Sequence, residues 1–244
     1  MSARGELEYE RYLPAEYKRD RLRIRRLDES GFEKLNPSLT KLRKLVYGIY
    51  SRGGLVEDVY EPERPDGLSV VYLVSSYGDG REGLDSLFGT NMKQKLGRVG
   101  VELSNYRDVA GFMRIEWGEK SSDGRVLLEP ALLMRWDGWP DGLLGYVGAF
   151  TTNPLLPRAV KLDIQRKLHE ELYALAGEFG FLDEIYTILA PNVLQFVLDS
   201  GLLVENIQGA TVDFQSALVD LYRRTHPGYW DNGPQLYKLI VKKK

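Results

Sequence analysis

The 244-residue chain contains no cysteine, and this absence excludes several classes of site at once. Without thiols there are no disulfides, no zinc–thiolate or iron–sulfur centres and no cysteine nucleophile. Histidine is also scarce, since His169 and His226 are the only two and do not stand at the spacing of metal ligands. We therefore expect no metal. A cysteine-free chain is also in keeping with a reducing compartment.

Long apolar runs and a strong net charge are missing as well. No window approaches the roughly 18 apolar residues of a membrane span, and residues 1–17 lack an apolar stretch of signal-peptide length. We expect a cytoplasmic protein without membrane association. The formal net charge of −2 provides no field that would attract nucleic acid. Residues 18–26 hold six basic residues and one acid, for which a solvated strand face is favoured over a basic groove.

The common catalytic signatures are absent too. There is no G-x-S-x-G, no Walker loop and no complete G-x-G-x-x-G. Serine-hydrolase and nucleotide-binding folds with these motifs are therefore not indicated.

The composition is that of a globular protein, with 43% apolar and 28% charged residues. A chain of this length can bury a large core without disulfides or metal ions to stabilise it. We expect one domain over residues 21–244, preceded by an N-terminal arm over residues 1–20.

Hydrophobic periodicity predicts the elements of this domain. Strands are expected at 21–27, 68–75, 109–117, 127–136, 143–150, 184–190, 202–212 and 236–241. Helices are expected at 32–49 (broken by Pro37), 84–96, 158–179, 191–200 and 214–222. Pro157 suits the start of the longest helix and Gly180 its end. The segments 109–117 and 127–136 are predicted to pair as a hairpin. The resulting fold class is α/β (α+β), with a mixed, mostly antiparallel central sheet and helices on both faces.

The order of these elements resembles the GNAT superfamily of acyl-CoA N-acyltransferases. The resemblance rests on residues 23–32, on Val109-Ala110-Gly111-Phe112-Met113-Arg114, on 145–152 with the helix that follows, on 184–190 and on 192–202. In that family the central strand is splayed from its neighbour, and the acyl donor binds exposed backbone in the gap. The donor pyrophosphate lies at the start of the next helix, where backbone N–H groups are unpaired.

The resemblance implies a donor site on this chain. Backbone groups of Val147, Ala149, Thr151 and Thr152 would bind the donor, and Arg158 and Asn192 would complete the site. The donor would be an acyl-CoA or an acyl-carrier protein, and the acceptor a small-molecule amine. Arg158 and the basic strand suit an acidic carrier protein.

Two positions depart from the family pattern. The loop 151–158 has no glycine, and its two prolines remove N–H donors. The tyrosine that many members place four residues before the terminal glycine of the short helix is Val197 here.

Three residues are candidates for proton transfer. Glu116 and Glu129 lie on predicted strands, where a carboxylate facing the cleft can activate an amine, and His226 lies in a loop rich in aromatic and cationic residues. Each has a structural alternative: a one-residue change of strand register reverses the facing of either glutamate, and His226 could be an ordinary loop residue near a helix end. Two other functions stay open: a non-catalytic GNAT-like binding or structural module, and a nucleic-acid-modifying enzyme on the same scaffold.

Overall fold

The computed structural model describes the chain in eight stretches, and every structural statement below concerns them. They are residues 8–27, 31, 69–78, 83–88, 109–119, 134–189, 191–212 and 235–241.

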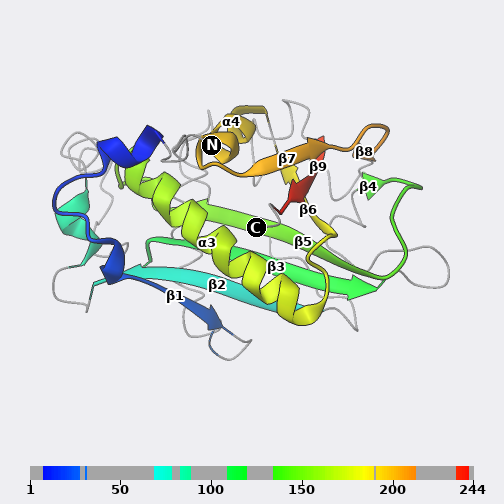
Figure 1. Cartoon of the computed structure of the whole chain (residues 1–244), viewed down its shortest axis with the longest axis horizontal. Helices are drawn as coiled ribbons and strands as arrows, with labels where there is room; N and C mark the ends of the chain where they lie inside the picture. The colour runs from blue at the N-terminus through cyan, green and yellow to red at the C-terminus, as the bar shows by residue number, and fades with distance from the viewer. Residues whose placement is uncertain are drawn as a thin grey trace, which may run out of the picture.

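A seven-stranded mixed sheet forms the body of the protein (Figure 1). Its spatial order is β1 (Leu22–Leu27), β2 (Ser69–Tyr77), β3 (Gly111–Glu119), β5 (Leu143–Thr152), β6 (Ile185–Leu189), β9 (Gln235–Ile240) and β7 (Leu203–Asn206). Every neighbouring pair is antiparallel except β5 and β6, which are parallel. The mixed, mostly antiparallel sheet predicted from the sequence is confirmed.

The long helix α3 (Arg158–Phe179) provides the crossover between the two parallel strands and lies across the sheet (Figure 1). Its bounds are those predicted from the apolar stripe, the proline and the glycine. Gly180 ends the helix at φ +86°, in the left-handed region where a side chain would be strained. The short helix α4 (Pro191–Asp199) follows β6 and ends before Gly201, as predicted.

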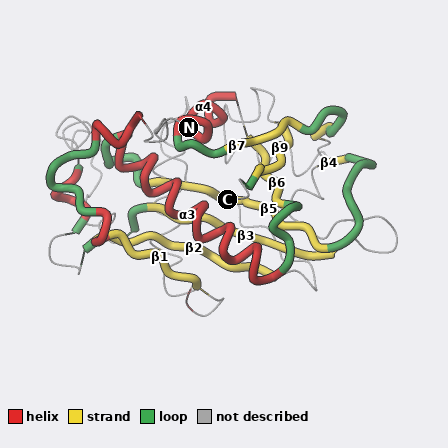
Figure 2. The backbone as a smooth tube through the Cα atoms, in the orientation of Figure 1, coloured by secondary structure: helices red, strands yellow, loops and turns green. Residues whose placement is uncertain are grey.

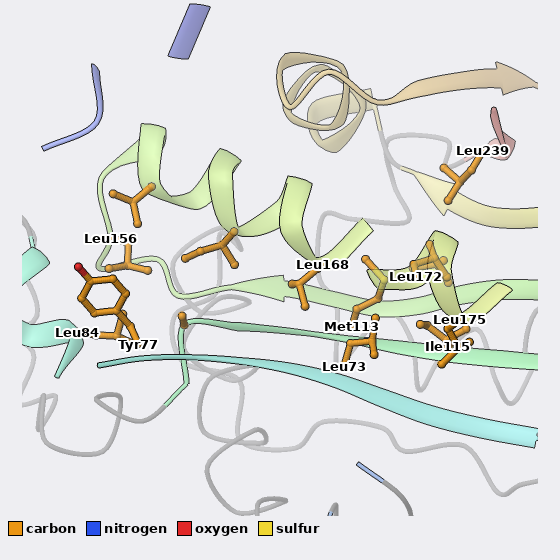
Figure 3. Packing of buried hydrophobic residues seen from close by; sticks show 14 of the residues in the cluster. Leu73, Tyr77, Leu84, Met113, Ile115, Leu156, Leu168, Leu172, Leu175 and Leu239 are labelled. Carbon is orange, nitrogen blue, oxygen red and sulfur yellow. The ribbon is translucent and has the colours of Figure 1, made fainter. Parts of the chain in front are cut away.

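The core lies between α3 and the sheet (Figure 3). Its labelled members include Leu168, Leu172 and Leu175 of α3, with Leu73, Met113 and Ile115 of β2 and β3. Each such side chain contributes about 1.5–3 kcal/mol when fully buried. Because side chains alternate along a strand, Met113 and Ile115 face α3 while Arg114 and Glu116 face the opposite side of the sheet.

Gly145 has a packing role in this core. A Cβ at this position would lie 2.3 Å from the ring of Phe181, so only glycine lets that ring lie against β5. This explains a glycine that the sequence alone left without a motif.

The predicted hairpin between 109–117 and 127–136 is wrong. Strand β3 has β2 on one side and β5 on the other, so neither edge is free for a further strand. The described end of the second segment, β4 (Met134–Arg135), pairs instead with β8 (Thr211–Val212) in a separate two-stranded sheet. Alternating hydrophobicity predicts a strand but carries no information about its partner.

Other predictions are only partly covered by the described stretches. The strand predicted at 202–212 is two strands, β7 and β8, separated by a turn in which Gly209 has φ +83°. The helix predicted at 84–96 begins as a short 3-10 helix, η3 (Leu84–Leu87). The helices predicted at 32–49 and 214–222 lie outside the described residues. No helix in the described stretches is long and apolar enough to cross a membrane.

The described part of the N-terminal arm lies against α3. It contains two 3-10 helices, η1 (Glu8–Tyr12) and η2 (Arg19–Arg21). The Tyr17 hydroxyl donates to Asp163 of α3 at 2.8 Å, and Arg19 forms an ion pair with the same carboxylate at 3.0 Å. Asp163 is fully buried. The boundary at residue 20 stays a prediction.

Part of the basic run is paired within the protein. Arg19 contacts Glu10 as well as Asp163, and Arg26 contacts Glu171 and Glu178 at 2.8 and 2.6 Å. These pairs favour a structural role for two of the six basic residues over a free basic groove.

Substituting Asp163 with asparagine should destabilise the protein. Arg166 also contacts this carboxylate, at 3.2 Å, so the change removes the shared counter-charge of two arginines. We expect the free energy of unfolding to fall by about 3 kcal/mol, the low end for a broken buried pair because both arginines are partly exposed. Urea denaturation measures the loss.

The matched control is Glu170→Gln on the same helix. Glu170 is half exposed and pairs with Arg166 and Lys167, so its loss should cost less than about 1 kcal/mol. Equal losses in the two variants would show that Asp163 does not anchor the arm.

Candidate functional site

Strands β5 and β6 pair over only three residues before they separate. The parallel register runs from Gly145↔Ile185 to Val147↔Thr187. Beyond it, residues 148–152 of β5 and 188–189 of β6 have no register with each other. We call this segment the splay. It is the separation of the central strand from its neighbour that the sequence resemblance implies.

A β-bulge in β5 accompanies the splay. On the β3 side, Arg114 pairs with Gly148 and Phe112 pairs with Thr151, so one extra residue of β5 lies opposite Met113. A bulge bends its strand and increases the local twist. The bulged residues, 149 and 150, begin two residues after the last pair with β6, which accounts for the divergence of the two strands.

Two side chains consolidate the start of the splay. The Thr187 hydroxyl of β6 donates to the Val147 carbonyl at 2.9 Å and satisfies the last acceptor of the pair. The Phe150 ring packs on the α3 side with its centroid 5.6 Å from that of His169. A hydrogen bond and a ring contact within the chain therefore accompany the divergence.

The loop from β5 to α3 is organised by Asn153, which is fully buried. Its side-chain amide donates to the Val109 carbonyl at 3.2 Å, and its side-chain oxygen accepts the Leu155 N–H at 3.1 Å. Its own N–H donates to Ala110 at 2.8 Å. An asparagine thus holds the turn where the family pattern has glycines, and Figure 2 shows this loop leading from β5 into α3.

Helix α3 starts without a side-chain cap. Pro157 occupies the cap position and makes no side-chain cap hydrogen bond to the first N–H groups. Such groups carry a partial positive charge. Arg158 is exposed, forms an ion pair with Asp199 at the end of α4 and lies 5.8 Å from the Phe196 ring centroid. Its charge is already matched within the protein.

The other predicted donor residues are distributed around the splay. Val147 is at its start, and Ala149, Thr151 and Thr152 lie on its β5 side. Asn192 is in the first turn of α4, directly after β6. The structure thus places all six predicted donor residues on β5, at the start of α3 or on α4, the elements that border the splay.

Val197, where the family pattern has a tyrosine, is buried in a cluster with Leu189 and Tyr237. It belongs to the interface between α4 and the sheet. This position has no proton to donate.

Glu116 lies on the face of the sheet opposite α3. It is fully buried, 2.6 Å from the guanidinium of Arg114. In register, Glu116 is beside Tyr146 and Arg114 is beside Gly148, the residue at which the splay begins. A carboxylate is therefore one strand away from the splay. Glu129 and His226 lie outside the described residues.

The sequence analysis missed an aromatic cluster around Tyr186 of β6. The Tyr186 ring has edge contacts with Trp136 and Trp139, at centroid distances of 6.1 and 5.1 Å. Its hydroxyl donates to Glu184, and burial raises its pKa above the usual range. Lys238 binds Glu184 at 2.7 Å. The sequence offers no signal for this cluster because its members are up to about a hundred residues apart.

The sequence analysis also missed a polar stripe on α3, of which it had named only His169. Gln165, His169 and Tyr173 follow one another at intervals of four residues, so they lie on one side of the helix. The His169 ring is bonded to the Gln165 carbonyl at 2.8 Å, so Nδ1 carries the proton. Burial lowers the pKa of His169 to about 4 and raises that of Tyr173 to about 12. Both side chains are therefore neutral at pH 7.

Among the described residues there is no cluster of three or more His, Asp or Glu side chains that could bind a metal ion.

No protein-family model matches the sequence, and no curated protein matches it. Several solved structures align with the fold. The GNAT domain of S. lividans PAT is 12% identical with a TM-score of 0.42, over 90% of each chain. The AHL synthase LasI is 15% identical with a TM-score of 0.45, over 91% of this chain and 98% of that one. NAA60 of Arabidopsis thaliana, in complex with acetyl-CoA, is 11% identical with a TM-score of 0.41, over 90% of this chain and 98% of that one.

These alignments agree in fold with the resemblance predicted from the sequence.

The buried, neutral His169 makes stability depend on pH. Its pKa is about 4 in the folded protein, against an ordinary 6.5, so the unfolded chain binds more protons between these values. The contribution of His169 to the free energy of unfolding should be fully present above about pH 6.5. The free energy of unfolding should then fall by on the order of 3 kcal/mol as the pH is lowered to about 4. Urea denaturation at several pH values measures this.

The variant His169→Gln isolates the effect, because its side chain does not titrate. Its stability should fall less steeply than that of the wild type over the same range. Parallel pH profiles for the two proteins would exclude a buried neutral imidazole.

Proposed function

We propose that the protein transfers an acyl group from a thioester donor to an amine acceptor. The observation that carries this proposal is the early end of the β5–β6 pairing, which leaves residues 148–152 of β5 without a register partner in β6. In a packed sheet, unpaired N–H and C=O groups cost free energy unless they find another partner. An extended donor can supply that partner.

The start of α3 supports the donor end of this proposal. The chain passes from the splay through the Asn153 turn to an uncapped helix N-terminus, and such ends bind anions. A donor lying along β5 would reach these N–H groups with its phosphate. Both acyl-CoA and an acyl-carrier protein present a thioester on a phosphorylated arm, so either fits this layout.

Glu116 supports the chemical step. The amine nitrogen attacks the thioester carbonyl carbon, the C–N bond forms, the C–S bond breaks, and the thiolate leaves. The amine must lose a proton, and a carboxylate that takes it directly or through water contributes to the rate. Glu116 is the described carboxylate of β3 on the face opposite α3, and its β5 neighbour Tyr146 comes two residues before the splay. The Arg114 guanidinium stabilises its negative charge.

A second candidate is a non-catalytic module with the same fold. Three observations favour it: the loop 151–158 has no glycine, Val197 has no proton to donate, and Arg158 is already paired with Asp199. Such a protein could retain the splay as a binding or structural feature without turnover. Donor binding and turnover separate the two candidates.

Thermal unfolding with coenzyme A, acetyl-CoA, a longer acyl-CoA and an acyl-carrier protein tests the donor. A ligand present at about a hundred times its dissociation constant stabilises the folded state by roughly 2.7 kcal/mol. We expect the unfolding temperature to rise with at least one thioester. Adenosine alone, at the same concentration, is the control for non-specific effects. No shift with any thioester would contradict the proposal and favour the non-catalytic module.

Substituting Glu116 with glutamine should lower kcat for acyl transfer by about 10²–10⁴-fold, the usual contribution of a general base. The amide keeps the shape of the side chain but cannot take the proton. The control is Glu119→Gln, an exposed carboxylate at the end of the same strand, which should leave kcat unchanged. A Glu116→Gln variant that stays folded by circular dichroism and keeps its activity would assign Glu116 a structural role.

A further inference from the structure

The polar stripe of α3 faces the splay, because its contacts come from both diverging strands. His169 packs against Phe150, which lies in the β5 part of the splay. Tyr173 packs against the cluster that contains Leu189, the last residue of β6. Gln165 stands one turn before His169 and is fully buried. The stripe therefore lies over the gap between the strands, on the α3 side.

Hydrogen-bonding groups on this stripe have no partner. Both the side-chain oxygen and the side-chain nitrogen of Gln165 are buried without one, and so is the Tyr173 hydroxyl. Buried polar groups are nearly always bonded, and each exception in a folded protein calls for an explanation. A different buried tyrosine in the same structure, Tyr17, is bonded to Asp163 at 2.8 Å. Tyr9, Arg19 and Arg166 around the N-terminal arm also have buried side-chain atoms without a hydrogen-bond partner, and the groups of Gln165 and Tyr173 are those that belong to the stripe.

The chemistry of the stripe restricts what it can bind. A glutamine amide offers one acceptor and one donor side by side, which matches a secondary amide. The neighbouring side chain of Phe150 and the cluster that contains Leu189 are apolar, and the stripe itself carries no charged group that would favour an ion. Gln165 and Tyr173 are about 12 Å apart along the helix axis. A slender neutral chain of amides and methylenes fits these constraints.

We propose that Gln165 and Tyr173 select the donor, by hydrogen-bonding the amide groups of its thioester arm, so that the protein recognises the arm and not the nucleotide beyond it. The inference rests on the proposed acyl transfer. It is consistent with a loop whose prolines remove N–H donors and with an Arg158 already paired with Asp199, both of which weaken recognition of the distal phosphates.

Stability provides a test that needs no ligand. If the Gln165 amide is unpartnered in the free protein, Gln165→Met should raise the unfolding temperature, by about 2–4 °C for a chain of this size. Tyr173→Phe should leave it equal or higher. The matched control is Tyr17→Phe, which removes a bonded hydroxyl and should lower it. A lower unfolding temperature for Gln165→Met would mean that the amide is bonded within the protein and would overturn the inference.

Donor specificity provides the second test. We expect octanoyl-pantetheine to be used with a kcat/KM within about tenfold of octanoyl-CoA. Gln165→Met and Tyr173→Phe should raise KM for both donors at least tenfold while kcat changes little, because binding to the arm is the same in the ground and transition states. Adenosine 3′,5′-bisphosphate, which lacks the arm, should not protect the wild type from thermal unfolding.

The outcomes separate this inference from the proposed function. Turnover of octanoyl-CoA with unchanged KM in both variants, or a hundredfold preference for octanoyl-CoA over octanoyl-pantetheine, overturns the inference alone. Failure of the wild type to bind or use any thioester overturns the proposed function and the inference with it.

Discussion

The parallel pairing of β5 and β6 ends after three residue pairs, and the rest of the site depends on this constraint. A strand in mid-sheet normally has both sides paired. Here the bulge opposite Met113 bends β5 while its other side stays bonded to β3, so the bend is directed away from β6 alone. Thr187 closes the paired part, and Phe150 fills the α3 side of the divergent part. The sheet stays continuous, yet residues 148–152 of β5 have no register partner in β6.

Three sides of helix α3 make different contacts. Leu168, Leu172 and Leu175 form the core against the sheet. Asp163 anchors the N-terminal segment through a buried network of tyrosine and arginine side chains. The stripe that includes Gln165 faces the splay. The first two sides stabilise the helix in place, which allows the third to carry polar groups that contribute nothing to stability in the free protein.

The two faces of the sheet divide the proposed chemistry between them. The α3 face carries the neutral stripe, suited to a slender uncharged arm. The opposite face carries the buried pair of Arg114 and Glu116, suited to proton transfer from an amine. Because the strands separate between these faces, a thioester held from one side could be reached by an acceptor from the other. No charged group has to cross the core.

The sequence by itself determined the elements for which the apolar periodicity agrees with residues that start or end an element, such as proline and glycine. Helix α3, its start after Pro157 and its end at Gly180 follow from local preferences, and so do the strands that flank it. The resemblance in element order put the predicted donor residues on elements that border the splay, and their role in donor binding stays a prediction. Local patterns did not determine strand partners: the pairing of β4 with β8 and the flanking of β3 by β5 depend on contacts between distant segments.

The tertiary structure alone decided which polar groups are buried and which have partners. The sequence did not show the contact of His169 with Phe150, and it assigned Arg158 to the donor without showing the ion pair of Arg158 with Asp199. Gln165 carried no signal, since a glutamine on a helix is ordinary until its surroundings are known. Burial and partnership depend on residues far apart in the chain, whereas periodicity reports only the local rise and rotation of the backbone.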